Sequence, residues 1–179
     1  MSDLSLFPHF EPRDFATDEG VSIRALVGGS GPPLLLLHGH PQTHAIWHKA
    51  APALASHFTL VLCDLRGYGD SSKPAGAPHH ANYSKRTMAR DMLSVMQQLG
   101  HASFSVMAHV RDARVAHRLA ADHGAAVRRL VLRRLADALV SVRTAADRNR
   151  RENYGSAHYY GGELSLNVDG APSLEAGRD

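Results

Sequence analysis

Four short runs of almost uninterrupted apolar residues divide the first 132 residues of the chain. They cover residues 34–37, 58–62, 104–107 and 130–132. Runs of this length without alternation are typical of strands that are covered on both faces of a sheet. Helical patterns lie between several of the runs, so strands and helices alternate along the chain. The sequence therefore predicts a mostly parallel α/β sheet, in which ligands bind at the carboxyl ends of the strands.

The clearest helical pattern lies between the second and third apolar runs. Five apolar side chains fall on one face at spacings of three and four, namely Met88, Met92, Val95, Met96 and Leu99. They predict a helix over 84–99 with its methionines in the core, and Gly100 follows as its stop. We also expect a hairpin over 10–30, a helix after residue 43 and a helix that ends near residue 122.

The pattern changes after residue 132. Apolar residues at 132, 135, 139, 142 and 146 have helical spacing with arginines between them. Beyond 152 the chain is rich in Gly, Ser and Asn and has little periodicity. We therefore expect a partial α/β core over 1–132, an Arg-rich helical segment over 133–152 and a poorly ordered tail over 153–179.

Composition fits a single globular domain. The 179 residues are 44% hydrophobic and 21% charged, and the net charge of +3 comes from arginines crowded between 128 and 151. Those arginines have no aromatic residues among them, so we expect neither a nucleic-acid nor a membrane partner. Cys63 is the sole cysteine, which excludes an internal disulfide, and its apolar neighbours predict a buried thiol. With no signal peptide or membrane-length run, we expect a cytoplasmic protein.

Three polar motifs follow three of the predicted strands. The first reads His-Gly-His-Pro-Gln-Thr over 38–43, and the second reads Asp-Leu-Arg-Gly-Tyr-Gly-Asp-Ser-Ser over 64–72. The third, Ala-His-Val-Arg-Asp-Ala-Arg over 108–114, lies where a buried strand turns sharply into a helix. One large class of hydrolases keeps its nucleophile at such a turn. Here Val110 occupies the tip.

Over about residues 8–132 the chain resembles the α/β-hydrolases and, among them, the haloacetate (fluoroacetate) dehalogenases. The His-Gly-x-Pro and Asp-x-x-Gly-x-Gly-x-Ser motifs carry the resemblance to the α/β-hydrolases. The Pro-Gln-Thr run and the two arginines Arg111 and Arg114 narrow that resemblance to the dehalogenases. The resemblance implies hydrolysis of the carbon–halogen bond of short 2-haloacids without a cofactor. By position, the backbone amides of His40 and Arg111 would hold the oxyanion, and Arg111 and Arg114 would bind the substrate carboxylate.

The chain departs from that family at the turn. The family pattern is Gly-His-Asp-Arg-Gly, and this chain has Ala-His-Val-Arg-Asp. Val110 has no lone pair, so it cannot form the covalent ester of the family's reaction. Asp112 is a poor substitute, because two residues further along a helix a side chain points about 200° away. The family's orienting acid falls on Arg134, counted without gaps.

The residues after 132 do not resemble the family's cap domain, last strands or catalytic histidine. We therefore expect a truncated α/β-hydrolase core with no competent catalytic residue. The alternatives are a pseudoenzyme that binds a small haloacid or carboxylate through Arg111 and Arg114, or another α/β-hydrolase activity such as epoxide or ester hydrolysis. His38, His40, His44 and His48 are dense, but no Cys or carboxylate joins them at ligand spacing, so we expect no metal. We expect Asp64 and Asp70 to order their loop.

Overall fold

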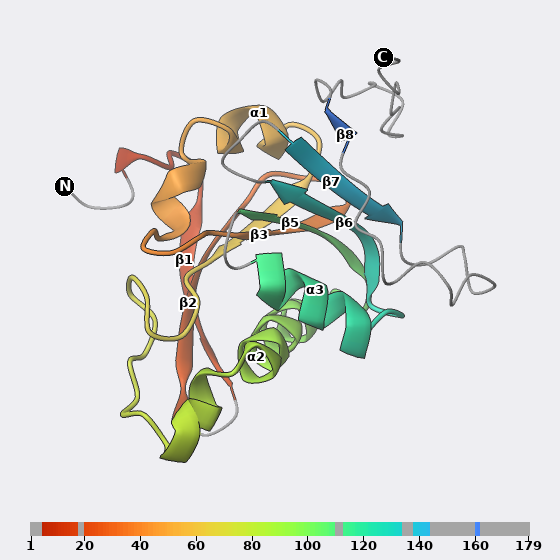
Figure 1. Cartoon of the computed structure of the whole chain (residues 1–179). Helices are drawn as coiled ribbons and strands as arrows, with labels where there is room; N and C mark the ends of the chain where they lie inside the picture. Colours follow the sequence, from red (N-terminus) through yellow and green to blue (C-terminus); the bar gives the residue numbers. More distant parts are fainter. Residues whose placement is uncertain (1–4, 18–19, 110–112, 134–137, 144–159, 162–179) are drawn as a thin grey trace.

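The computed structural model describes residues 5–17, 20–109, 113–133, 138–143 and 160–161, with side chains as far as residue 132. Its strands are β1 Glu11–Ala16, β2 Ser22–Gly28, β3 Pro33–Leu37, β4 Thr59–Cys63, β5 Phe104–His109, β6 Val127–Arg133, β7 Ala138–Arg143 and β8 Tyr160–Gly161. Its α-helices are α1 Ala51–Ala55, α2 Lys85–Gln98 and α3 Ala113–Asp122, and 3₁₀ helices cover His44–Trp47 and Pro78–Tyr83. Figure 1 shows their arrangement.

The described strands form one sheet in the order β1-β2-β4-β3-β5-β6-β7-β8. The four central strands, β4, β3, β5 and β6, are parallel, and the strands outside them pair antiparallel. The expected α/β sheet and the expected hairpin, which is β1 with β2, are both confirmed. Leu37 pairs with Cys63 on one side and with Ala108 on the other. The three motifs that follow β3, β4 and β5 therefore start at the same edge of the sheet.

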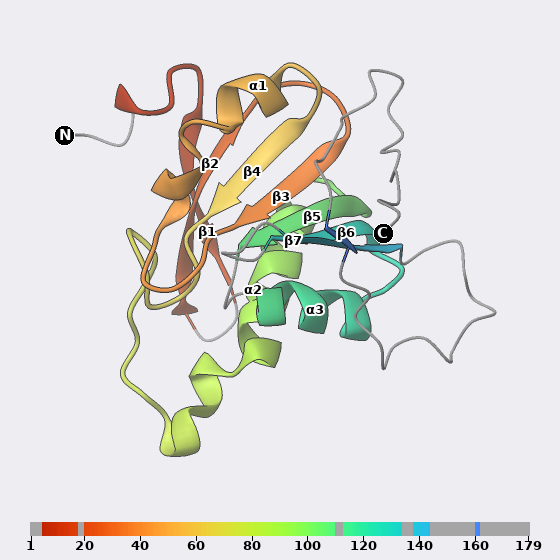
Figure 2. The ribbon, with the colours of Figure 1, turned by 45° about the horizontal axis from the view of Figure 1, so that its top comes forward.

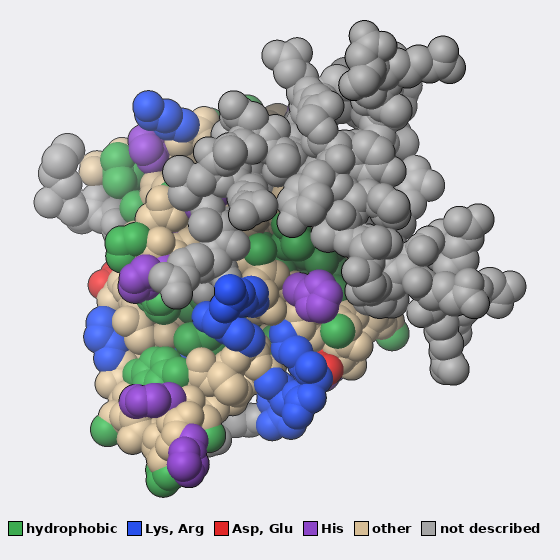
Figure 3. Space-filling model, in the orientation of Figure 1, with side chains coloured by type: hydrophobic (Ala, Val, Ile, Leu, Met, Phe, Trp, Pro, Cys, Tyr) green, Lys and Arg blue, Asp and Glu red, His purple; other side chains and the backbone are tan. Residues whose placement is uncertain are grey.

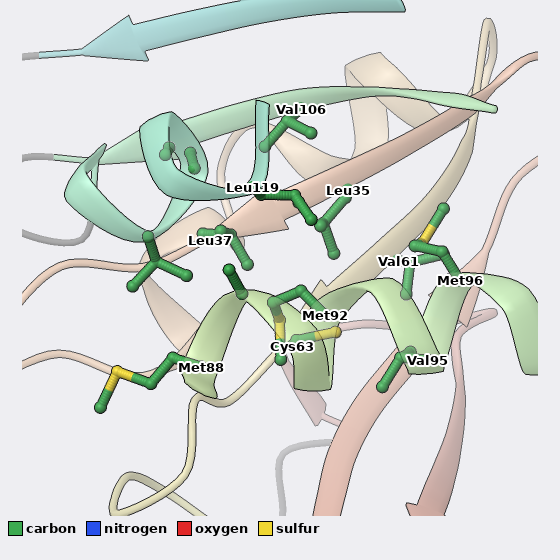
Figure 4. Close-up of a cluster of buried hydrophobic side chains, with 14 of the residues drawn as sticks. Leu35, Leu37, Val61, Cys63, Met88, Met92, Val95, Met96, Val106 and Leu119 are labelled. Atoms are coloured by element: carbon green, nitrogen blue, oxygen red, sulfur yellow. The ribbon is translucent and has the colours of Figure 1, made fainter. Parts of the chain in front are cut away.

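Helices cover both faces of the parallel strands, with α2 and α3 on one face and α1 on the other (Figure 2). On the α2–α3 face, Leu35, Leu37 and Val61 pack against Met92 and Leu119 (Figure 4). The alternate residues of the same strands pack against Trp47 and Leu54 on the opposite face. All these leucines and valines of β3 and β4 are buried, as the uninterrupted apolar runs predict.

Helix α2 confirms the predicted methionine face. Met88, Met92 and Met96 are all buried in the core. The helix begins where the Ser84 hydroxyl accepts a hydrogen bond from the amide of Thr87 at 3.1 Å, which satisfies one of its free N–H groups. It ends before Gly100, whose φ of +81° is a conformation that glycine adopts without strain.

The single helix expected after residue 43 is divided in two. A 3₁₀ turn over His44–Trp47 is followed by the short helix α1, Ala51–Ala55. Pro52 lies in the first turn of α1, where its missing N–H costs nothing. The same proline within a continuous helix would have removed a hydrogen bond, so the second helix begins there.

The expectation of a helical segment over 133–152 is wrong at residues 138–143, where the structure has a strand. These six residues form β7, antiparallel to β6, and β6 itself runs on to Arg133. Val140 and Val142 are β-branched and alternate with Ser141, which favours a strand once β6 offers an unpaired edge. Residues 134–137 and 144–152 lie outside the described part, as does the predicted tail over 153–179 apart from β8.

Candidate functional site

The loop over residues 38–44 leaves β3 at the carboxyl edge of the sheet, and contacts with the loop after β4 and with the end of β5 hold it. His38 is completely buried at its start. Its Nε2 accepts a hydrogen bond from the amide of Leu65 at 3.1 Å, and its Nδ1 lies 3.0 Å from the carbonyl oxygen of Gly39. Because Leu65 must donate, Nδ1 carries the proton and the ring is neutral. His38 therefore orders the loop.

Gly39 lets this loop lie directly against the end of β5. A Cβ atom at Gly39 would lie 3.0 Å from the carbonyl oxygen of His109 and 3.0 Å from Oε1 of Gln42. The same Gln42 Oε1 is 3.1 Å from Nδ1 of His109, so a hydrogen bond joins the loop to the last residue of β5. The predicted oxyanion loop is thus adjacent to the residue that precedes Val110.

His40 lies at the exposed tip of the loop. Its Nδ1 is 3.0 Å from the hydroxyl oxygen of Tyr68 in the second motif. The Tyr68 ring also packs edge-on against the rings of His40 and His38, with centroids 5.9 and 5.0 Å apart. The first and second motifs are therefore in direct contact beside the predicted oxyanion donor.

The Asp64 carboxylate accepts hydrogen bonds from the end of the first loop and from the second motif. One carboxylate oxygen accepts the backbone N–H of His44 at 2.8 Å and lies 3.0 Å from Nδ1 of that histidine, and the other accepts the N–H of Asp70 at 3.0 Å. Burial opposes ionisation, yet the hydrogen bonds from His44 and Asp70 and the charge of His44 hold the pKa of Asp64 below its ordinary value. The expectation that Asp64 orders its loop agrees with these contacts.

The glycines of the second motif are required by this packing. Gly67 and Gly69 both have positive φ, at +88° and +48°. A Cβ atom at Gly69 would overlap the Asp64 carboxylate. Ser71, in the same motif, donates to the carbonyl oxygen of Asp64 at 2.6 Å and accepts from the amide of Arg24 at 2.9 Å. The spacing of this motif is therefore explained by how its loop folds around one carboxylate.

Arg66 and Asp91 form a buried ion pair that the sequence pattern alone did not identify. The guanidinium donates to both carboxylate oxygens, at 2.6 and 2.7 Å, and to the carbonyl oxygen of Asn82 at 2.8 Å. The Thr17 hydroxyl adds a third hydrogen bond to Asp91 at 2.8 Å. One signal was available, because Asp91 adjoins Met92 on the apolar side of a predicted helix. A charge there requires a partner.

The predicted carboxylate-binding arginines are only partly described. Arg114 is exposed in the first turn of α3. Val110, Arg111 and Asp112 lie outside the described residues, as does Arg134. The pairing of Arg111 with Arg114 therefore remains a prediction, and so do the oxyanion donors at His40 and Arg111.

His48 bonds within its own turn, and Cys63 lies in the core. Within the described ranges, no three His, Cys, Asp or Glu side chains come together as a metal site. His48 directs Nδ1 to the carbonyl oxygen of Ala45 at 2.9 Å. Cys63 is buried as expected, and burial raises the pKa of its thiol. No helix in the described part has the length and apolar character needed to cross a bilayer.

Comparison with known proteins gives one consistent result. A family model for the alpha/beta hydrolase fold matches residues 32–150. Fluoroacetate dehalogenase from Burkholderia sp is 53% identical over 119 residues, which are 66% of this chain and 38% of that protein. Soluble epoxide hydrolase from Corynebacterium sp. (strain C12) is 40% identical over 113 residues, 63% of this chain and 38% of that protein.

Comparison with solved structures also gives an alpha/beta hydrolase. A proposed alpha/beta hydrolase from Nostoc sp PCC 7120 has a TM-score of 0.67 and 58% identity, covering 69% of this chain and 42% of that one. The chain thus spans about two fifths of the length of these relatives.

Proposed function

Because the chain belongs to the alpha/beta hydrolase family, we propose that it binds small carboxylates of the haloacetate type at the carboxyl edge of its sheet and does not hydrolyse them. The fluoroacetate dehalogenase relative names the substrate class. The observation that carries the proposal is that valine stands at position 110, directly after His109, the last residue of β5, whose carbonyl oxygen lies against Gly39.

The chemistry at this position requires an attacking atom. In a haloacetate dehalogenase, a carboxylate oxygen forms a bond to the halogen-bearing carbon while the carbon–halogen bond breaks and halide leaves. Water then hydrolyses the resulting ester. Valine offers only carbon and hydrogen, so the first bond cannot form at Val110.

Binding of a carboxylate requires hydrogen-bond donors and positive charge rather than a nucleophile, and the chain retains such groups. Backbone N–H groups of the loop at His40 and the guanidinium groups of Arg111 and Arg114 are donors that match a carboxylate. The contacts of His38, Asp64 and Gln42 hold the loop in place. A loop that its own contacts already hold loses little entropy on binding.

Epoxide hydrolysis is the second candidate, favoured by the 40% identity to a soluble epoxide hydrolase. The ring-opening step needs a nucleophile at the same turn, so Val110 opposes it for the same reason. An uncharged epoxide would also make no use of the paired arginines. We therefore rank carboxylate binding first.

Isothermal titration of fluoroacetate into the purified chain tests the proposal. We expect saturable binding that weakens about ten-fold or more in Arg114→Gln, since a charged hydrogen bond contributes about 1.5–3 kcal/mol. Arg90→Gln is the matched control, because Arg90 is an exposed arginine on α2. A short DNA duplex should give no heat. Equal weakening in both variants, or no binding by the unaltered chain, would refute the proposal.

A further inference from the structure

Arginines project from the two helices that cover one face of the sheet. Arg86 and Arg90 are exposed on α2, and Arg114 and Arg118 are exposed or half-buried on α3. The two arginines of each helix are four residues apart, a spacing that places them on one side of that helix. Helices α2 and α3 pack against each other, and Lys and Arg side chains gather on the surface that they form (Figure 3).

Asp122 joins the two arginine pairs across the contact between the helices. Its carboxylate accepts hydrogen bonds from Nε of Arg118 at 2.6 Å, from Nη2 of the same arginine and from Nε of Arg86 at 3.3 Å. Hydrogen bonding by Arg118 is the main reason that the pKa of Asp122 lies below its ordinary value, so this carboxylate is charged. The four arginines and Asp122 are called the arginine face below.

Two arginines of this face have no carboxylate. Arg90 lies one turn along α2 from Arg86, and Arg114 lies one turn along α3 from Arg118. Within the described part of the chain, neither Arg90 nor Arg114 forms an ion pair. Four guanidinium groups therefore share one negative charge, and the two without a partner are on different helices.

We propose that the arginine face is a docking surface for an acidic segment of a partner protein, whose carboxylates pair with Arg90 and Arg114. Asp122 shows the chemistry on the chain itself, because guanidinium groups bind a carboxylate through two N–H donors at once. Glutamates one helical turn apart are separated by about 6 Å along the axis, the same rise as the arginines of each pair. This docking goes beyond the proposed function; Arg114 also belongs to the proposed haloacetate site, whereas the α2 arginines do not.

Nucleic acid and membranes fit the arginine face less well. Nucleic acid presents a continuous row of phosphates, which Asp122 would repel, whereas a protein segment can carry carboxylates at separate positions. Neither α2 nor α3 contains an aromatic residue on which a base could stack. Binding to a membrane surface needs apolar side chains beside the cations. The large apolar side chain that is exposed among the described residues is Leu6, which lies before β1.

A second copy of this chain is also a poor occupant. The exposed carboxylates of the described residues outside the arginine face are Glu11, Asp14 and Asp70. They already pair with Arg13 and Arg24. Docking one copy on another would therefore exchange existing ion pairs for similar new ones and gain little.

Fluorescence anisotropy with a labelled helical peptide that carries glutamate at every fourth position tests the proposal at low ionic strength. We expect saturable binding to the full chain, and none by the same peptide with glutamine in place of glutamate. The double variant Arg86→Gln with Arg90→Gln should bind about ten-fold more weakly, since each exposed ion pair contributes a factor of up to about five. The double variant Arg13→Gln with Lys49→Gln loses the same charge from other exposed positions and should stay within about two-fold of the unaltered chain.

Asp122→Asn should change the affinity in the opposite direction. The substitution removes the negative charge between Arg86 and Arg118 and leaves both arginines free to pair with the peptide. We expect the glutamate peptide to bind about three-fold more tightly, a gain that an unfolded or damaged variant cannot give. Weaker binding by a folded Asp122→Asn variant would overturn the proposal.

The remaining outcomes separate this docking surface from the proposed haloacetate site. No saturable binding of the glutamate peptide, or equal weakening in the two double variants, would overturn the docking surface. Tighter binding of a DNA duplex, or of phosphatidylglycerol vesicles, would overturn the choice of an acidic protein segment. Fluoroacetate binding should persist in the variant without Arg86 and Arg90, because Arg114 is retained. If the unaltered chain binds the peptide but not fluoroacetate, the haloacetate proposal fails and the docking surface stands.

Discussion

Gly69 lies against the Asp64 carboxylate with no room for a side chain. Gly69→Ala should therefore destabilise the fold by about 2–5 kcal/mol, the sum of a positive-φ penalty and overpacking. Gly100→Ala is the matched control, since its φ is also positive but nothing lies within 4 Å of the added Cβ. It should cost only about 1–2 kcal/mol. Urea unfolding measures both, and equal losses would contradict the packing described here.

Asp64 makes stability depend on pH in a defined direction. Its pKa is lowered in the folded chain, so the unfolded chain binds its proton more readily. The contribution is therefore fully present above the unfolded pKa of about 3.9 and is lost as the pH falls through the lower folded value. We expect the unfolding free energy of Asp64→Asn to be lower near pH 7 and to change less between about pH 5 and 3. Parallel pH curves for the variant and the unaltered chain would contradict this role.

The Arg66–Asp91 pair connects elements that are distant in the sequence. It joins the loop after β4 to α2, and the hydroxyl of Thr17, the residue after β1, donates a hydrogen bond to the same carboxylate. Removing one partner leaves a buried charge, so Arg66→Met should cost about 3–5 kcal/mol. The double variant Arg66→Met with Asp91→Leu should lose less than the sum of its two single changes. Chemical denaturation of the four proteins measures this coupling, and simple additivity would show that the pair does not act as a unit.

Elements with a strong local pattern could be predicted from the sequence. The runs at 34–37 and 104–107 became β3 and β5, and the methionine spacing gave α2 to within a residue or two. Residues 138–143 could not be predicted in the same way, because Leu139 and Val142 satisfy helical spacing while Val140 and Val142 satisfy a strand. Pairing with β6 decides between the two, and that contact is tertiary.

The candidate site was predictable as a set of motifs but not as a set of contacts. The motif loops after β3 and β4 were placed at one edge from the order of strands alone. The contacts of His40 with Tyr68, Gln42 with His109 and Arg66 with Asp91 join residues 25 to 67 positions apart. No local pattern encodes such pairs, because they depend on how two loops meet after the sheet has formed.

At the scale of the whole molecule, positive charge gathers beside the proposed site. Lys and Arg side chains cluster on the face formed by α2 and α3 (Figure 3). Arg86 and Arg118 both pair with Asp122, while Arg90 and Arg114 have no ion pair within the described residues. With a net charge of +3, this face raises the local concentration of small anions near the first turn of α3.

The central proposal is that the chain binds a haloacetate of the kind named by its fluoroacetate dehalogenase relative and does not hydrolyse it. Fluorine-19 NMR of fluoroacetate mixed with the purified chain tests both halves at once. We predict that the fluoroacetate signal broadens or shifts in proportion to the chain added, while no fluoride signal grows over days. A fluoride signal that grows in proportion to the chain, and stops when the chain is heat-denatured, would contradict the account.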